Sequence, residues 1–254
     1  MRGQGFYRVR APWLVLGTGA ALALMTSAPA GASRMLFIGD SITSGAGLEP
    51  GTAYPELVAT AFPALEGVNA GCPGSATADW VRPGPTVGCG VAGAFDLLAA
   101  PNLPAEIATI LLGTNDAVGF FEPGPVSPAS YRSNLEHVIA RLEPETQWIL
   151  LMTPPARGPG NPAADALLSS YRDEVLDLCS APSDSVVCGP DVQLLLDPAL
   201  HFSDGIHPDA VGHALIADAL VSDLMLLVPE PATAMLVLSA LLALGGLRRR
   251  AGRR

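Results

Sequence analysis

The sequence predicts one α/β domain, a three-layer α/β/α sandwich with a mostly parallel central sheet. Short apolar runs alternate along the chain with longer segments whose apolar residues recur at helical spacing, a pattern typical of parallel strands covered by helices on both faces. The run from Glu106 to Leu112 has no charge after its first residue, as expected of a central strand buried on both faces. About 200 residues remain once the two chain ends are set aside, enough for one well-packed core.

The expected elements of the first half follow in order along the chain. A buried strand at 34–38 stops at a tight turn that begins with Gly39, and a helical face over 53–62 ends at a proline. A second strand is expected at 67–69. The segment 71–93 is rich in Gly, Pro and Cys and is expected to be a loop before the third strand.

The second half repeats the alternation. Ser127 is a suitable cap for the next helix, and Pro128 suits its first turn. The remaining elements are a strand, a helix, a short strand and a final helix, at 147–152, 163–178, 185–188 and 208–227.

Both chain ends differ in composition from the expected domain, residues 31–228. Residues 1–30 begin with arginines, continue with an uncharged stretch and end in small residues, which is the layout of a secretory signal peptide. Residues 229–254 contain an uncharged apolar run, 232–247, followed by five arginines. This run is slightly short for a bilayer, but flanking residues can lie in the interface, so we expect a transmembrane segment there.

The charge distribution excludes several classes of function. The chain contains no lysine, and all 14 basic residues are arginines. Residues 31–231 hold all 24 acidic residues but only six arginines, so this part has a formal net charge of −18. Such a field repels phosphate backbones and disfavours nucleic-acid binding. Without lysine, a Schiff-base enzyme, a Walker P-loop and a Ser-x-x-Lys acyl transferase are all excluded.

The four cysteines form an even set in a chain that is expected to be exported, so disulfides are the leading interpretation. Three pairings are possible, and the sequence-local one joins Cys72 to Cys89 and Cys179 to Cys188. A zinc site is the alternative, but no Cys-x-x-Cys pair occurs and no histidine lies at ligand spacing from a cysteine. We expect no metal.

One motif points formally to a nucleotide cofactor. Residues 88–93 match the Gly-x-Gly-x-x-Gly pattern of dinucleotide-binding folds. That pattern needs a strand before it and a helix after it, whereas here a Pro- and Gly-rich stretch precedes it. We therefore expect no cofactor.

Polar residues gather directly after the expected strands, where an open parallel sheet binds its ligands. Three blocks follow the first three strands and a fourth precedes the last helix: Gly39–Thr43, Asn69–Gly74, Gly113–Asp116 and Asp204–Pro208. Each block alone could be a set of turn or capping residues. Their joint occurrence favours a catalytic site.

Together the blocks contain the parts of an acyl-transfer site. A serine hydroxyl needs a base within hydrogen-bond reach, and His207 is the candidate base for Ser41. Asp204, three residues before His207, can hold the other ring nitrogen. The Ser41 and Gly74 amides and the Asn115 side chain are candidate donors to the oxyanion of a tetrahedral intermediate.

The remaining histidines are assigned to other roles. His137 and His213 lie within expected helices and are read as surface or hydrogen-bonded core residues. His201 lies in the same loop as Asp204 and His207 and could line the pocket.

The four blocks resemble those of the SGNH hydrolase superfamily, the GDSL-type lipases and esterases, over about residues 34–227. The Gly-Asp-Ser block, with a glycine four residues after its serine, is matched by Gly39, Asp40, Ser41 and Gly45. The other blocks are matched by 69–74, by Gly113, Asn115 and Asp116, and by Asp204 and His207. The resemblance implies a flavodoxin-like fold, Ser41 as nucleophile, Asp204 and His207 as its triad partners, and Gly74 and Asn115 as oxyanion donors. It also implies ester hydrolysis through an acyl-enzyme.

The C-terminal segment resembles a second known signal. Val228-Pro229-Glu230-Pro231, the apolar run and the arginine cluster are similar to the PEP-CTERM sorting signal of bacteria that make exopolysaccharide. This implies a membrane-anchored precursor, processing by an exosortase-type enzyme, and delivery to the periplasm, the outer envelope or the medium.

We therefore expect an exported serine esterase that acts on short acyl esters, above all acetyl esters of a polysaccharide or other carbohydrate. One alternative is a lysophospholipase or lipase-like acyl hydrolase, which a membrane anchor would place near lipid. The other is a surface or matrix binding protein whose active site is inactive.

Overall fold

The computed structural model describes residues 33–82, 93–119, 124–158 and 161–227. Within them, five strands form one sheet in the order β2-β1-β3-β4-β5, and all neighbouring strands are parallel. The strands are β1 (Arg34–Gly39), β2 (Glu66–Gly71), β3 (Ala105–Leu111), β4 (Thr146–Leu151) and β5 (Val186–Cys188). This is the strand order of flavodoxin-like folds, so the predicted α/β/α sandwich is confirmed.

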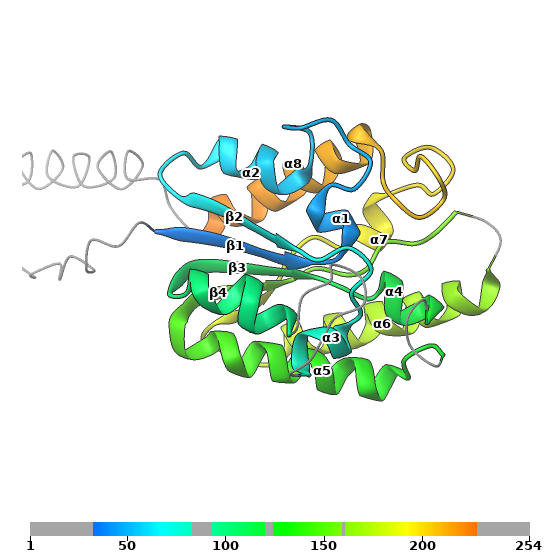
Figure 1. Cartoon of the computed structure of the whole chain (residues 1–254), viewed down its shortest axis with the longest axis horizontal. Helices are drawn as coiled ribbons and strands as arrows, with labels where there is room; N and C mark the ends of the chain where they lie inside the picture. The colour runs from blue at the N-terminus through cyan, green and yellow to red at the C-terminus, as the bar shows by residue number, and fades with distance from the viewer. Residues whose placement is uncertain (1–32, 83–92, 120–123, 159–160, 228–254) are drawn as a thin grey trace, which may run out of the picture. The chain divides into compact units, whose positions relative to one another are not determined.

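Helices cover both faces of the sheet. The α-helices are α1 (Ser41–Ser44), α2 (Tyr54–Ala61), α3 (Thr77–Val81), α4 (Thr114–Val118), α5 (Pro128–Leu142), α6 (Pro162–Ser180), α7 (Val192–Leu195) and α8 (Ala210–Leu227). Shorter turns of other helix types lie at Phe95–Ala99, Ala100–Asn102 and Glu143–Glu145. Helices α2 and α8 lie on one face, and α3, α5 and α6 on the other (Figure 1).

Alternation along the strands divides the core between the two faces. On β1, Leu36 and Ile38 pack with the cluster that contains α5 and α6, whereas Met35 and Phe37 pack with the cluster that contains α2 and α8. All four side chains are buried. The central strands are thus covered on both faces, as their unbroken apolar sequences predict.

Of two local expectations, one is confirmed and one is wrong. Ser127 does cap α5, since its side chain accepts a hydrogen bond from the Ser130 amide. The segment expected to be a loop contains helix α3, however. Its first turn is held by Asp79, whose carboxylate accepts from the Ala76 amide, and Trp80 on it is buried.

One of the two predicted disulfides lies within the described residues. Cys179, at the end of α6, is bonded to Cys188, at the end of β5, with their Cα atoms 4.8 Å apart. The predicted partner of Cys72 is Cys89, which lies outside the described residues. That pairing stays a prediction, as do the assignments of 1–30 and 229–254, which also lie outside them.

Helix α8 is a core helix of the domain. By length and composition it could cross a membrane, but its residues Ile216, Leu220 and Leu224 are buried. His213 on α8 accepts a 3.1 Å hydrogen bond through Nδ1 from the Tyr54 amide at the start of α2. Burial lowers the pKa of His213 to about 4, so the ring is the neutral acceptor that this bond requires.

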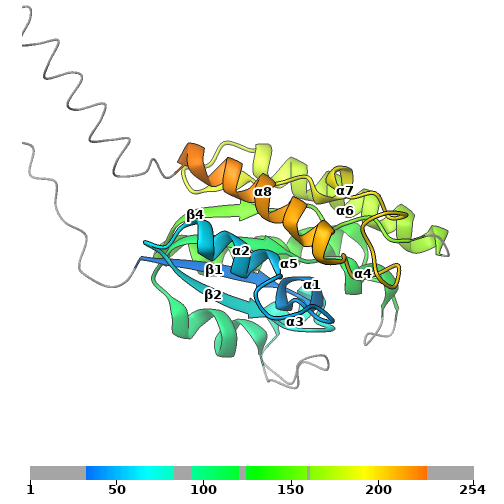
Figure 2. The same ribbon diagram turned by 90° about the horizontal axis from the view of Figure 1, so that it is seen from above.

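The ends of the domain lie on one side of it. Strand β1 begins, and helix α8 ends, at the amino edge of the sheet (Figure 2). The carboxyl ends of the parallel strands point the opposite way; three of the polar blocks follow them there, and the fourth lies in the loop before α8.

Candidate active site

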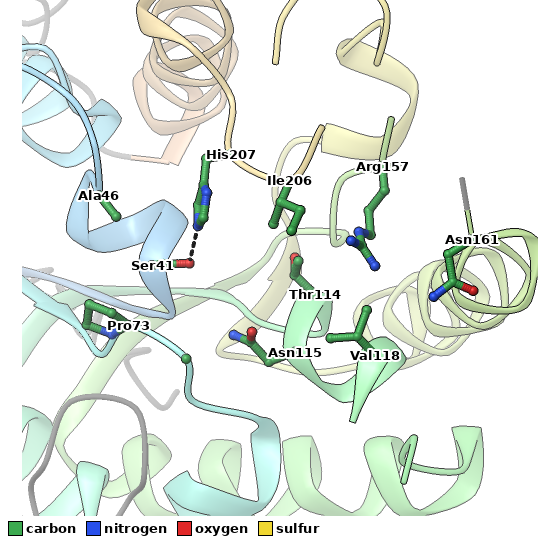
Figure 3. A pocket seen from close by; sticks show the side chains of 11 residues that line it. Ser41, Ala46, Pro73, Thr114, Asn115, Val118, Arg157, Asn161, Ile206 and His207 are labelled. Atoms are coloured by element: carbon green, nitrogen blue, oxygen red, sulfur yellow. Dashed lines mark hydrogen bonds between the residues drawn. The ribbon is translucent and has the colours of Figure 1, made fainter. Parts of the chain in front are cut away.

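Ser41 is the first residue of α1, directly after β1. The preceding residue, Asp40, caps this short helix, because its Oδ1 accepts a 2.9 Å hydrogen bond from the Ile42 amide. The sharp change from strand to helix leaves the Ser41 side chain at the carboxyl edge of the sheet, facing a cavity (Figure 3).

His207 reaches Ser41 from the loop before α8. Its Nε2 lies 2.9 Å from Ser41 Oγ, and its Nδ1 lies 2.7 Å from Asp204 Oδ2. With the ring proton on Nδ1, the imidazole donates to Asp204 and accepts from the serine hydroxyl. These three residues are therefore brought together in the order that proton transfer from a serine requires.

Hydrogen bonds from its own loop keep the Asp204 carboxyl group ionised. Partial burial raises the pKa of this carboxyl, but hydrogen bonds from the His207 ring, the His207 amide and the Ile206 amide outweigh burial and lower the pKa to about 2. The carboxylate is ionised at neutral pH. It can orient the His207 ring and stabilise an imidazolium.

Two residues that line the cavity, Ser41 and Gly74, have backbone amides without a hydrogen-bond partner among the described residues. Neither the Ser41 amide nor the Gly74 amide donates a hydrogen bond within the described part of the chain. Gly74 has a φ of +79°, a left-handed conformation that a side chain would strain. Both amides are available to an incoming oxyanion.

Asn69 fixes the loop that carries Gly74. Its Nδ2 donates 2.8 Å to the Thr43 carbonyl of α1, and its Oδ1 accepts 2.9 Å from the Gly71 amide. This side chain joins the loop after β2 to the helix of Ser41. It therefore has a positioning part in the site.

The third expected donor, Asn115 on α4, is already engaged in part. Its Nδ2 donates 3.0 Å to the Ser75 carbonyl and lies 3.4 Å from Asp40 Oδ2. The first contact orients the carboxamide, whereas the second is at the long limit for a hydrogen bond. One amide hydrogen can turn from Asp40 to a substrate oxygen.

Two buried carboxyl groups, those of Asp40 and Asp116, are sequence neighbours of Ser41 and Asn115. Desolvation raises the pKa of Asp40 to about 7, helped by repulsion from Asp116 and opposed by the Ile42 amide. Desolvation likewise raises the pKa of Asp116 to about 6, although hydrogen bonds from the Thr77 side chain and amide oppose it. Asp116 holds the start of α3 against α4 and does not line the cavity.

The cavity beside Ser41 has a volume of about 490 Å³. Four of the predicted site residues line it, namely Ser41, Gly74, Asn115 and His207. The other lining residues are Ala46, Pro73, Thr114, Val118, Arg157, Asn161 and Ile206. This is the size of a pocket that takes a small organic ligand.

Sequence reasoning missed Arg157 and Asn161. Both come after β4, on the side of the sheet where ligands bind, but neither directly follows the strand or belongs to a motif that the sequence would mark. His201, by contrast, does not line the cavity, and its Nδ1 accepts a 2.9 Å hydrogen bond from the Asp197 amide. His137 is exposed and contacts the Ser133 carbonyl.

Similar proteins are known at the level of family and fold. The family model described as GDSL-like Lipase/Acylhydrolase matches residues 37–215. No curated protein matches the chain.

Among solved structures, an acetylxylan esterase from Geobacillus stearothermophilus is 22% identical with a TM-score of 0.59, the match covering 76% of this chain and 94% of that one. An aryl esterase from M. smegmatis is 18% identical with a TM-score of 0.59, covering 78% and 100%. An α/β-hydrolase enzyme from the metagenome of Lake Arreo, Spain, is 25% identical with a TM-score of 0.57, covering 76% and 94%.

Proposed function

The chain belongs to the GDSL-like lipase/acylhydrolase family and is a serine hydrolase acting on ester bonds, and we propose that Ser41, His207 and Asp204 are its catalytic triad. The observation that carries this proposal is the 2.9 Å distance between His207 Nε2 and Ser41 Oγ, with Asp204 2.7 Å from the other ring nitrogen. A serine becomes nucleophilic when a base accepts its proton and a carboxylate fixes the tautomer of that base.

In the proposed reaction, Ser41 Oγ attacks the ester carbonyl carbon while His207 Nε2 takes the hydroxyl proton. The amides of Ser41 and Gly74 and the Asn115 side chain donate to the resulting oxyanion. The ester C–O bond then breaks, His207 returns its proton to the departing alcohol oxygen, and an acyl-Ser41 remains. A water molecule attacks this acyl group while His207 Nε2 takes its proton; the bond from the acyl carbon to Ser41 Oγ then breaks, His207 returns the proton to Oγ, and the carboxylic acid leaves.

We propose short acyl esters of carbohydrate, acetyl esters first, as the substrates. The charge of −18 on residues 31–231 disfavours approach to anionic lipid surfaces. The Geobacillus enzyme of similar fold is an acetylxylan esterase. Acetylated xylan is therefore the first polysaccharide to test.

The experiment compares kcat/KM for chromogenic acetyl, butyryl and palmitoyl esters and measures acetate release from acetylated xylan, with Ser41→Ala as control. We expect a preference for acetyl over palmitoyl and release of acetate by the wild type alone. A preference for palmitoyl esters without acetate release would favour a lysophospholipase-like enzyme. Failure to hydrolyse any ester would favour a binding protein.

We also propose that the enzyme is exported, through residues 1–30, and anchored as a precursor through 229–254 before exosortase-type processing. The Cys179–Cys188 disulfide supports an oxidising compartment. Cell fractionation of a host that expresses the full chain, or a chain ending at Val228, tests this. We expect the full chain in membranes and the shortened one in the periplasm or medium with activity retained. Recovery of both chains in the cytoplasm would contradict export.

A further inference from the structure

Arg157 stands apart from the other arginines of the domain. Its Nε and Nη1 atoms are shielded from solvent, and neither has a hydrogen-bond partner in the described part of the chain. Four other arginines each pair with a carboxylate: Arg34 with Glu66, Arg132 with Glu136, Glu174 and Asp177, Arg141 with Asp96, and Arg172 with Asp191. Shielded N–H groups without a partner are unfavourable, because they lose their bonds to water and nothing replaces those bonds.

The guanidinium of Arg157 lies in the wall of the catalytic cavity. Figure 3 shows its side chain pointing into the space across from Ser41 and His207. No acidic side chain lines that cavity within the described residues. Among the described residues, the Arg157 guanidinium therefore has no carboxylate beside it in the cavity wall.

Asn161 lies beside Arg157 in the same wall. Its Oδ1 accepts a 3.1 Å hydrogen bond from the Ala164 amide and so caps α6. Because the carboxamide oxygen of Asn161 accepts this bond, its NH₂ group is left as a donor. The wall thus offers a guanidinium and an amide donor together.

The backbone holds Arg157 in register with the catalytic loop. The amide of the next residue, Gly158, donates 2.8 Å to the Gly205 carbonyl, between Asp204 and Ile206. The two segments are in close contact there, since a Cβ on Gly158 would lie 2.8 Å from Gly205 Cα. The position of the guanidinium is therefore coupled to that of the loop that carries Asp204 and His207.

We propose that Arg157, assisted by Asn161, binds a carboxylate of the ester substrate, so that this enzyme prefers anionic esters over neutral ones of the same size. The planar guanidinium donates two parallel hydrogen bonds to a carboxylate, a geometry that a neutral hydroxyl cannot match. The inference rests on the proposed ester hydrolysis and specifies its substrate class. The carboxylate can belong to the sugar, as in an acetylated uronic acid, or to the acyl chain, as in a hemiester of a dicarboxylic acid.

The net negative charge of the domain opposes anionic substrates only at long range. At about 0.15 M salt, charges more than about 8 Å apart are largely screened, whereas a contact inside a cavity is screened much less. The test is therefore made at this ionic strength, where the contact with Arg157 decides the preference.

The experiment measures kcat/KM for two matched pairs with wild type, Arg157→Met and Arg157→Lys. The first pair is the acetyl esters of a methyl glucuronide and of a methyl glucoside. The second is the 4-nitrophenyl esters of succinate and of butyrate. Arg34→Met, which removes a surface arginine at the far end of β1, is the matched control.

We expect Arg157→Met to lower kcat/KM for one anionic ester by about 10- to 100-fold, mainly through KM, and to change its neutral partner by less than about threefold. Arg157→Lys should retain part of the preference, and Arg34→Met all of it. The pair that responds identifies the sugar or the acyl chain as the carrier of the carboxylate.

Equal kcat/KM for both members of each pair in the wild type would overturn the proposal. So would an equal loss on anionic and neutral esters in Arg157→Met. If Arg157→Met does not fold, inhibition of the wild type decides: methyl glucuronide or succinate should inhibit, while methyl glucoside and butyramide should not. Ser41→Ala tests the proposed function separately from the carboxylate proposal. If this variant no longer hydrolyses neutral esters, ester hydrolysis through Ser41 is supported even when the carboxylate proposal fails.

Discussion

The Gly158 amide donates a hydrogen bond to the Gly205 carbonyl, 2.8 Å away, and this contact joins the segment after β4 to the loop before α8. This hydrogen bond therefore connects the segment that carries Arg157 to the loop that carries His207, and both residues line the cavity. The absence of a side chain at position 158 is what allows the two backbones to approach.

Gly158→Ala should lower catalytic efficiency more than stability. A Cβ there would lie 2.8 Å from Gly205 Cα, so the loop of Asp204 and His207 must shift. A displacement of about 1 Å in a catalytic group can cost about 100-fold in rate, and we expect a fall in kcat of at least about tenfold. Steady-state kinetics and thermal unfolding provide the measurement. The control is Gly67→Ala near the start of β2, where a Cβ would crowd Ala59 of α2. This variant should lower the unfolding temperature but leave kcat unchanged.

Ser41→Ala and His207→Ala should each lower kcat by roughly three to six orders of magnitude, because the members of a triad act as a unit. Asp204→Ala should cost less, since the base remains. Hydrolysis of a chromogenic acetyl ester measures these effects, and circular dichroism checks the fold. His137→Ala changes an exposed histidine and is the control. Near-normal activity in Ser41→Ala would contradict the triad.

Asp40→Asn should stabilise the protein at high pH relative to the wild type. Burial raises the pKa of Asp40 from 3.8 to about 7, so between these values the folded state binds a proton that the unfolded state releases. Asp40 therefore lowers the free energy of unfolding as pH rises from about 4 to about 7, and asparagine removes this dependence while still accepting from Ile42.

The measurement is urea unfolding of wild type and Asp40→Asn at pH 4.5 and pH 8. We expect the difference in unfolding free energy to move in favour of the variant by about 3 kcal/mol between the two pH values. Subtracting the wild-type value from the variant value at each pH cancels the contributions of the other titrating groups, because both proteins contain them. A difference that is independent of pH would show that Asp40 is ionised throughout this range.

Cys179→Ala combined with Cys188→Ala should lower the free energy of unfolding by about 2–3 kcal/mol, the entropy of closing a short loop. The bridge joins α6 to β5 and does not line the cavity, so kcat/KM should be unchanged. Thermal unfolding and ester kinetics measure the two effects. An equal loss of activity and stability would show that the bridge also shapes the site.

The fold followed from the sequence because local signals and tertiary packing agree in the central strands. The apolar run that includes Ile107 and Ile110 requires burial on both faces, and only a central strand of a covered sheet provides it. Helix α3 was missed because it is short and depends on the cap from Asp79 rather than on apolar periodicity.

The site was predictable where chemistry follows a strand and not where it depends on contacts between loops. Ser41 and His207 belong to recognisable blocks, and the strand-end rule brings them to one edge. Arg157 has no such block, and its place depends on the contact between Gly158 and Gly205. The bond from Asn115 to the Ser75 carbonyl was equally hidden, since no sequence pattern reports the direction of a single carbonyl.

Strand β1 begins and α8 ends at the amino edge of the sheet, while Ser41 and the cavity lie beyond the carboxyl edge. Anything joined to the domain after Leu227 is therefore attached at the end of the sheet opposite the cavity, so the attachment point itself does not obstruct access to Ser41.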